Sequence, residues 1–519
     1  MKTTETTRRE LLRLASGLSI VGAAGSAFGL QLATMGSAAA QSAPGDYRAL
    51  VCIFLFGGND AHNTLLATDT DSWGRYFATR NQGSDPIALM PVGAAVTPVG
   101  QVSPITGRTA RLDSPENWGG VLPIATNTAN PIPPGTNAST RTFAIHPLLA
   151  PLAPIWEAGR LAAVANVGPL IRPLTRQQYE SGTVPAPRNL FSHNDQQSTW
   201  QAGTVEGARR GWGGLMADQL LSSNGTNTVF SAISTSGNAV FLAGQNVVQY
   251  QVSTGSNAPA IRINGATGTS LFGSSGNPAR LADIIRDTAP ANYMSKDVAG
   301  RVIRSMDSAA MLNNAFANPT AQAIPAPPQI INPSTGTLET NQLAVQLQTV
   351  ARMIASNSAL GLRRQVFFVS IGGFDTHDTQ NRSQATLLAR VGAAMAYFDG
   401  VLGNIGGVNM RPSVTTFTAS DFSRTFNTNG DGTDHAWGAH HFVMGGAVRG
   451  RDVYGQFPTV GISQGGFVNP NMSRNALIPG ISVEQYASPM GRWFGLSDAA
   501  LASIFPNLGN FATGAADFI

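Results

Sequence analysis

The sequence predicts an α/β fold in which a mostly parallel central sheet is covered by helices on both sides, as a three-layer sandwich. Short continuous apolar runs, typical of strands buried on both faces, alternate along the chain with segments of helical periodicity. Three of these runs end directly in a segment rich in Gly, Asn or Asp. Apolar residues make up 42% of the chain, which is enough to build one large core.

The first part of the chain opens with a strand. Residues 48–56 (RALVCIFLF) form a continuous apolar run, which we interpret as the first central strand. Residues 81–142 are rich in Pro, Gly, Thr and Asn and predict a loop excursion. A short helix over residues 146–160 and a second buried strand over residues 161–167 follow it.

Helix and strand then alternate again. Residues 213–222 fit an amphipathic helix, and residues 229–234 fit a strand. Ser, Gly, Asn and Pro dominate residues 235–340 around one predicted helix (295–313), so this segment predicts a loop-rich insertion or cap. The later core elements are helix, strand, helix and strand, over residues 341–359, 366–371, 383–402 and 414–419. We therefore expect a single α/β domain over residues 41–519.

Residues 1–40 predict a twin-arginine signal peptide that is removed after export. Arg8 and Arg9 precede a stretch, residues 14–35, whose apolar character is diluted by Gly, Ser and Ala. Residues 38–40 (AAA) form a small-residue cleavage site, so the mature chain begins at Gln41. The expected partners are the twin-arginine translocase and a signal peptidase, and the expected location is the periplasm or the exterior. An uncleaved membrane anchor is the alternative, but the segment has few large apolar residues with which to span a membrane. After cleavage, we expect the mature protein not to bind a membrane.

The charge balance and the single cysteine exclude several classes of function. Without residues 1–40 the chain carries 29 basic and 27 acidic residues and has no run of Lys or Arg, so nucleic-acid binding is not expected. Cys52 lies within the first apolar run, where we expect it to pack as a small apolar residue. Neither a phosphate-binding loop nor a Gly-x-Ser-x-Gly nucleophile motif is present, so nucleotide cofactors and a serine hydrolase are disfavoured.

Acidic residues follow three of the predicted strands. Asp60, Asp375 and Asp421 each come just after a strand end. In sheets of this kind the ligand site lies beyond the carboxyl ends of the strands, so we expect the three residues to converge at one edge. The alternative is that each aspartate caps a helix or turns a loop.

Histidines lie in polar segments beside these strand ends or in probable loops. The segments are GGNDAHN (57–63), SHNDQQSTW (192–200), GGFDTHD (372–378) and GDGTDHAWGAHH (430–441). Carboxylates and neutral imidazoles from separate loops are the ligands that a divalent cation needs. The sequence therefore predicts a divalent metal ion, zinc, calcium or magnesium, as the cofactor.

These segments also carry a family resemblance. Together with HPLLAPLAPIW, GWGGLMAD, SDFSRTFNTNGDGTDH and HHFVMGGAVRG, they resemble the twin-arginine-exported family known as domain of unknown function 1501, over most of residues 47–460. That family is similar in turn to the alkaline phosphatase and sulfatase superfamily, whose members hydrolyse phosphate or sulfate esters at one or two metals. The resemblance implies an alkaline-phosphatase-like fold and an exported, metal-dependent ester hydrolase.

The superfamily resemblance also implies metal ligands. Asp60 resembles the aspartate that holds the second metal, and Asp421 resembles a later aspartate of that site. Asp375, His377 and His435 resemble ligands of the first metal.

The catalytic residues follow from the same resemblance. A hydroxyl at a helix N-terminus near the metals is the nucleophile of many superfamily members, and Ser198 or Thr199 occupies the corresponding place in chain order. His193 and Asp195 lie nearby as a further ligand or a base. The expected chemistry is activation of Ser198 or of a water by the cation, with His193 or His435 carrying a proton, on a small or polymeric ester.

A non-catalytic role is the main alternative. Phe422 stands where a ligating histidine usually follows the aspartate, and Asp375 and His377 are spaced more tightly than in the superfamily. These departures favour an envelope protein that keeps the fold and binds a partner or a polysaccharide through residues 235–340.

Overall fold

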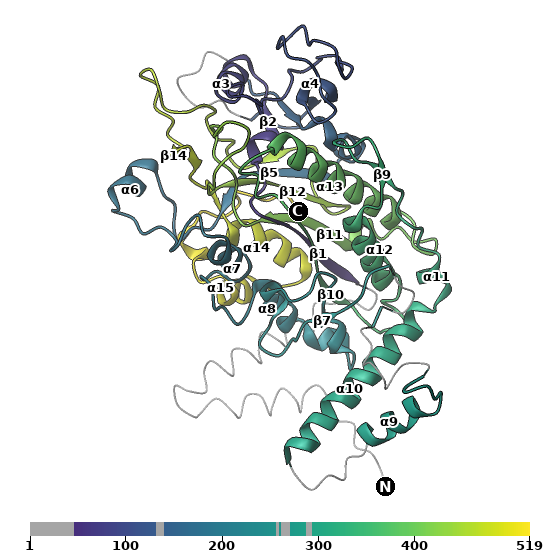
Figure 1. Ribbon diagram of the computed structural model, residues 1–519. Helices are drawn as coiled ribbons and strands as arrows, with labels where there is room; N and C mark the ends of the chain where they lie inside the picture. Colours follow the sequence, from purple (N-terminus) through teal and green to yellow (C-terminus); the bar gives the residue numbers. More distant parts are fainter. Residues whose placement is uncertain (1–45, 131–139, 256–258, 261–269, 287–292) are drawn as a thin grey trace.

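The computed structural model describes residues 46–130, 140–255, 259–260, 270–286 and 293–519 (Figure 1). The predicted signal peptide, residues 1–40, lies outside the described residues.

A mixed sheet forms the centre of the described part of the chain. Its strands lie in the order β13-β5-β12-β11-β1-β10-β6-β7, and β16 also pairs with β5. The bounds are β1 Arg48–Phe56, β5 Leu161–Gly168, β6 Ala232–Ser234, β7 Tyr250–Gln251, β10 Arg364–Gly372, β11 Val414–Ser420, β12 Ala439–Gly445, β13 Val453–Tyr454 and β16 Ile481–Ser482. β1 is parallel to both of its neighbours, β10 and β11, whereas β12 is antiparallel to both β11 and β5.

The central strand β1 is buried on both faces, as its continuous apolar run predicts. Val51 and Ile53 belong to one hydrophobic core, whereas Cys52 and Phe54 belong to another. Successive side chains of a strand point to opposite faces, so the two cores lie on opposite sides of the sheet. Cys52 packs as a small apolar residue in the second core, as expected.

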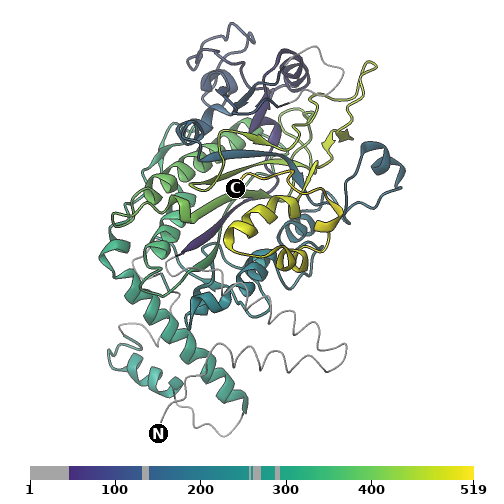
Figure 2. The same ribbon diagram turned by 180° about the vertical axis from the view of Figure 1, so that it is seen from behind.

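Helices cover both faces of the sheet (Figures 1 and 2). On the first face lie α12 (Gln342–Ala355), α13 (Gln380–Leu402), the 3₁₀ helix η2 (Pro147–Leu152) and α5 (Ala153–Glu157). On the second face lie α7 (His193–Ala202), α8 (Trp212–Gln219), α14 (Val483–Phe494) and α15 (Asp498–Ile504). α13 is apolar and long enough to cross a membrane by composition alone, but 61% of its most apolar window is buried inside the protein.

The predicted α/β class is confirmed, and most predicted core elements lie within a few residues of their observed bounds. The strand predicted over residues 48–56 is β1, and the helix predicted over 383–402 is α13. The strand predicted over residues 229–234 is shorter, because residues 228–230 form a 3₁₀ turn before β6.

Two segments differ from the sequence prediction. Residues 439–445 form the antiparallel strand β12, where no strand is predicted from the sequence, so the sheet is mixed. Residues 193–202, another polar segment, form helix α7, which Ser192 caps by accepting from the Asp195 N–H.

The predicted insertion, residues 235–340, lies partly in the sheet and partly outside it. β7 pairs with β6, whereas α9 (Asn277–Arg286) and the start of α10 (Tyr293–Phe316) project from the body in both views (Figures 1 and 2). The other elements are α3 Thr70–Arg80, α4 Pro115–Trp118, α6 Arg176–Ser181, α11 Pro319–Gln322, β2 Leu65–Ala67, β3 Leu122–Ile124, β4 Phe143–Ile145, β8 Ile330–Ile331, β9 Leu338–Glu339, β14 Met472–Ser473 and β15 Ala476–Leu477. The excursion predicted over residues 81–142 thus contains α4 and β3.

Candidate functional site

Three neighbouring parallel strands end at the same edge of the sheet. Phe56 at the end of β1 pairs with Gly372 of β10, and Leu55 pairs with Ser420 of β11. The segments that follow carry Asp60, Asp375 and Asp421, as the rule for parallel sheets predicts.

Gly57 allows two of these segments to approach closely. Its φ is +112°, and a Cβ at this position would lie 2.4 Å from the backbone nitrogen of Asp375. A larger residue here would displace the loop that carries Asp375.

His193, Asp375 and His435 form what we call the histidine–aspartate cluster. One ligand atom of each lies within 4.8 Å of the others. His193 Nε2 is 3.4 Å from Asp375 Oδ2, and His435 Nε2 is 3.2 Å from Asp375 Oδ1. The three residues come from the start of α7, the segment after β10 and the segment before β12, so the fold joins them from distant parts of the sequence.

Hydrogen bonds on the far side of each ring orient the two cluster histidines. His193 Nδ1 lies 2.7 Å from Asp421 Oδ2, and His435 Nδ1 lies 2.7 Å from the carbonyl oxygen of Phe191. A carboxylate and a carbonyl oxygen only accept, so Nδ1 of each ring carries the hydrogen and donates it. Each neutral ring then presents the lone pair of Nε2 to the cluster, and Nε2 of His193 is buried without a hydrogen-bond partner.

Asp421 supports His193 from inside the protein. Its side chain is completely buried, and Oδ2 also accepts from Gln197 Nε2 at 2.8 Å and from the Gly57 N–H at 3.2 Å. The hydrogen bond between His193 Nδ1 and Asp421 raises the pKa of His193, although burial lowers it. A carboxylate that accepts from the far nitrogen of an imidazole is a common second layer around metal-binding histidines.

Arg424 holds Asp375 in its charged form. Its buried guanidinium donates from Nη1 to Asp375 Oδ1 at 2.8 Å and from Nη2 to the Thr433 carbonyl at 2.6 Å. Burial alone would raise the pKa of Asp375, but the charge and hydrogen bond of Arg424 outweigh it, so the pKa is lowered. Burial lowers the pKa of His435, which favours its neutral form.

His377 and Phe422 border the cluster. His377 Nε2 is 2.9 Å from His435 Nε2 and 3.2 Å from Asp375 Oδ1, and its side chain is about half exposed. The Phe422 ring centroid is 4.7 Å from those of both His193 and His435. Phe422 therefore forms an apolar wall, whereas His377 lies at the open side.

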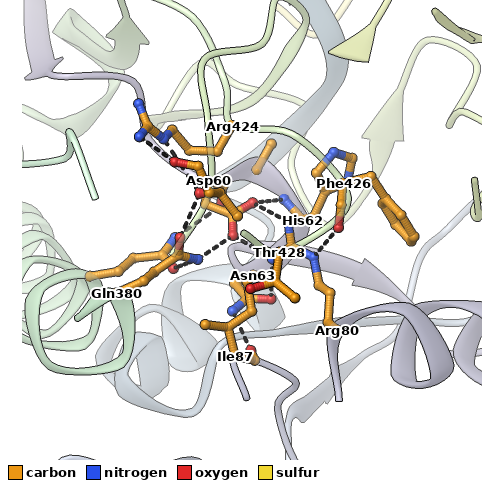
Figure 3. Close-up of polar contacts among 12 residues, drawn as sticks. Asp60, His62, Asn63, Arg80, Ile87, Gln380, Arg424, Phe426 and Thr428 are labelled. Atoms are coloured by element: carbon orange, nitrogen blue, oxygen red, sulfur yellow. Dashed lines mark hydrogen bonds and ion pairs between the residues drawn. The ribbon is translucent and has the colours of Figure 1, made fainter. Parts of the chain in front are cut away.

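Asp60 lies in a fully buried network of hydrogen bonds beside the cluster, which Figure 3 shows. Arg80 pairs with both of its carboxylate oxygens, Gln380 Nε2 donates to Oδ2 at 2.6 Å, and the His62 N–H donates to Oδ1 at 3.0 Å. The side chains of Asp60 and Arg80 are both fully buried. Asp60 is therefore the partner of Arg80 and does not join the cluster.

The predicted nucleophiles also lie away from the cluster. The Ser198 hydroxyl donates to the Val205 carbonyl at 2.9 Å, and the Thr199 hydroxyl donates to the Asp195 carbonyl at 2.7 Å. The Asp195 carboxylate accepts from the Ser192 hydroxyl and from the Glu206 N–H. Of the predicted residues, the fold thus gathers His193, Asp375, His377, Asp421 and His435 and leaves Asp60, Asp195, Ser198 and Thr199 outside.

The model of the family described as "Protein of unknown function (DUF1501)" matches residues 47–505. The chain belongs to this family. No curated protein matches the chain. The region matched by the DUF1501 model contains every residue of the cluster and its supporting hydrogen bonds.

Sequence reasoning on this DUF1501 chain missed three supporting residues. Gln197 stands four residues after His193, a spacing that places both on one face of a helix once α7 is recognised. Arg424 lies in the same polar segment as Asp421, so its presence near the site could have been inferred. Arg80 is at the end of α3, and no local pattern links it to Asp60.

Proposed function

We propose that this DUF1501 protein is an exported, divalent-metal-dependent hydrolase of phosphate, sulfate or related esters, with an alkaline-phosphatase-like fold. The observation that carries the proposal is the histidine–aspartate cluster, in which three ligand atoms lie within 4.8 Å of one another. The buried Nε2 of His193, which makes no hydrogen bond, supports it, because a buried nitrogen without a hydrogen bond is unfavourable unless something binds it.

The residues present fit a divalent cation. His193, Asp375 and His435 would hold it. Two imidazoles and one carboxylate suit zinc better than calcium or magnesium, which prefer oxygen ligands. His193 Nε2 and His435 Nε2 lie 3.4 and 3.2 Å from the two oxygens of Asp375, so the three side chains are close enough to hold one cation together.

The local charges explain why a cation would be needed before an anionic ester could enter. Asp375, Asp421 and the more exposed Asp434 provide three carboxylates and Arg424 one guanidinium, so the site has two net negative charges when its histidines are neutral. A bound divalent ion would neutralise this charge, polarise the ester oxygen and lower the pKa of a water.

We propose a water as the nucleophile. The hydroxyls of Ser198 and Thr199 both donate to main-chain carbonyls in or beside α7, away from the cluster. His377 is half exposed at the open side of the cluster, with Nδ1 3.4 Å from Asp434 Oδ1, and would receive the proton of that water.

Export by the twin-arginine route remains part of the proposal. That route carries folded proteins, so the chain would acquire its cation on the cytoplasmic side and meet its ester in the periplasm or outside the cell. The translocase and a signal peptidase are the expected partners.

The test is hydrolysis by protein purified without metal and then loaded with zinc, manganese, calcium or magnesium. We expect zinc to support hydrolysis of 4-nitrophenyl phosphate, bis(4-nitrophenyl) phosphate or 4-nitrophenyl sulfate. His193→Ala and Asp375→Ala should lower the rate at least about 100-fold, because each removes a metal ligand. Ser198→Ala is the matched control and should keep the rate. Turnover that needs Ser198 would rule out a water nucleophile, and a protein that binds no added cation would rule out the hydrolase.

A non-catalytic envelope protein with one metal is a second candidate, and two observations favour it. Asp60 is already paired with Arg80, and Phe422 occupies the position of a histidine, so the superfamily's second metal site lacks these ligands. Zinc bound at one equivalent, without turnover of any of these esters, would support this candidate.

A further inference from the structure

A cavity of about 300 Å³ lies on the second face of the sheet, outside the histidine–aspartate cluster. Its wall is mostly apolar and includes Leu170, Val205, Trp212, Leu215 and Phe505. α7, which begins with His193, also contributes Thr199 and Ala202 to this wall. The volume is at the lower end of the range for small-molecule sites, about 300–1,000 Å³.

Glu484 brings a carboxyl group into this apolar wall. It is the second residue of α14, and its side chain is buried. Its Oε1 accepts from Asn507 Nδ2 at a long 3.4 Å, and its Oε2 is buried without a hydrogen-bond partner. Burial raises the pKa of Glu484, although hydrogen bonds with its own N–H, the Ser482 hydroxyl and Asn507 act in the opposite direction.

The helix itself does not require this carboxylate. Ser482 and Gln485 form a complete capping box at the start of α14, so the first turn already has its side-chain partners. The basic residue among those lining the cavity, Arg188, is exposed, so solvent screens its charge. Glu484 is therefore the buried carboxyl group of the cavity wall, and its Oε2 accepts no hydrogen bond.

We propose that this cavity binds a small organic ammonium ion, with an apolar body of roughly ten non-hydrogen atoms and a primary amine at one end. The amine would donate to the Glu484 carboxylate, and the apolar body would lie against the aromatic wall. Trp212 and Phe505 have ring centroids 6.0 Å apart there, and aromatic faces also attract cations. This proposal does not depend on the hydrolase.

The test is a calorimetric titration at pH 7.5 with phenethylamine, and with 2-phenylethanol as its neutral counterpart of the same size. We expect the wild-type protein to bind the amine at least tenfold more tightly than the alcohol. Glu484→Gln should abolish this preference, whereas Glu206→Gln, which removes an exposed carboxylate nearby, should keep it.

Three results would overturn the proposal: no binding of either probe, equal binding of both, or a preference that survives in Glu484→Gln. Thermal unfolding of Glu484→Gln serves as the folding control, and we expect its midpoint to equal or exceed that of the wild type, because the variant removes a poorly solvated carboxyl group. His193→Ala should bind the amine normally, so failure of the hydrolase and failure of this site are distinguishable.

Discussion

Asp60 and Asp375 follow two adjacent strands of one sheet, yet they have opposite surroundings. Asp60 is fully buried, and Arg80, Gln380 and a main-chain N–H satisfy its oxygens (Figure 3). Asp375 is about 40% exposed and shares its oxygens between one arginine and three histidines. An acidic residue after a strand can thus belong to a structural ion pair or be available as a ligand. The side chains around it determine which role it has.

The same contrast holds for the histidines of the two regions. His440 is buried near His62, with 6.5 Å between ring centroids, and its Nδ1 accepts from the Asn166 N–H at 3.0 Å. His193 and His435 instead donate from Nδ1 and turn Nε2 toward the cluster. We therefore expect changes in the closed region to affect stability and changes in the open region to affect cation binding.

The largest effect is expected in the closed region. Arg80→Met would leave the Asp60 carboxylate buried and unpaired, which should lower the free energy of unfolding by about 3–5 kcal/mol. His377→Ala changes a half-exposed side chain in the open region and should lower the free energy of unfolding by less than about 1 kcal/mol. Urea unfolding of metal-free proteins measures both. Equal losses in the two variants would remove the distinction between the regions.

The second largest effect is expected on zinc affinity when Asp421, which lies behind His193, is changed. Asp421→Asn replaces the charged acceptor of His193 Nδ1 with a neutral amide, so zinc should bind about 10- to 100-fold more weakly. Competition with a chromogenic chelator measures this change. Asp434→Asn, at a side chain that is 59% exposed, is the control and should keep the wild-type affinity within about threefold. Wild-type affinity in Asp421→Asn would show that this carboxylate does not position the ligand.

The smallest effect concerns acid stability. Burial lowers the pKa of His440 to about 3, below its unfolded value of about 6.5. The unfolded chain therefore binds more protons between these values, and stability falls as the pH falls from about 6.5 toward 3. His440 should contribute up to about 1.4 kcal/mol per pH unit in this window.

Urea unfolding at pH 7, 6 and 5 tests this contribution. His440→Gln keeps a side chain that can accept from Asn166, so its stability should depend less on pH than that of the wild type. An unchanged slope in His440→Gln would mean that His440 is protonated in the folded protein.

The positions of the strand ends could be predicted from the sequence, but the partners of each side chain could not. Apolar runs buried on both faces place Asp60, Asp375 and Asp421 at one edge because parallel strands all end there. Whether Asp60 meets an arginine depends on the path of the chain from η1 (Ala61–Asn63) to the end of α3, which tertiary packing determines.

Composition does not predict regular structure where polar residues form it. Residues 192–200 contain no apolar periodicity, yet α7 forms because Ser192 caps it and Trp200 packs into the core. His440 and His441 lie in β12, where burial between β11 and β5 overrides their polar character. Tertiary contacts, which a local sequence pattern does not contain, therefore determine both α7 and β12.

The pairing of β1 also constrains when this protein can fold. Arg48 pairs with Arg364, and Ala49 pairs with Val414, so both neighbours of the central strand are synthesised more than 300 residues after it. An apolar strand that leaves the ribosome so long before its partners exposes its apolar side chains in the meantime, which favours aggregation. The sheet, and with it the cluster at its edge, can therefore be completed only after most of the chain has been translated.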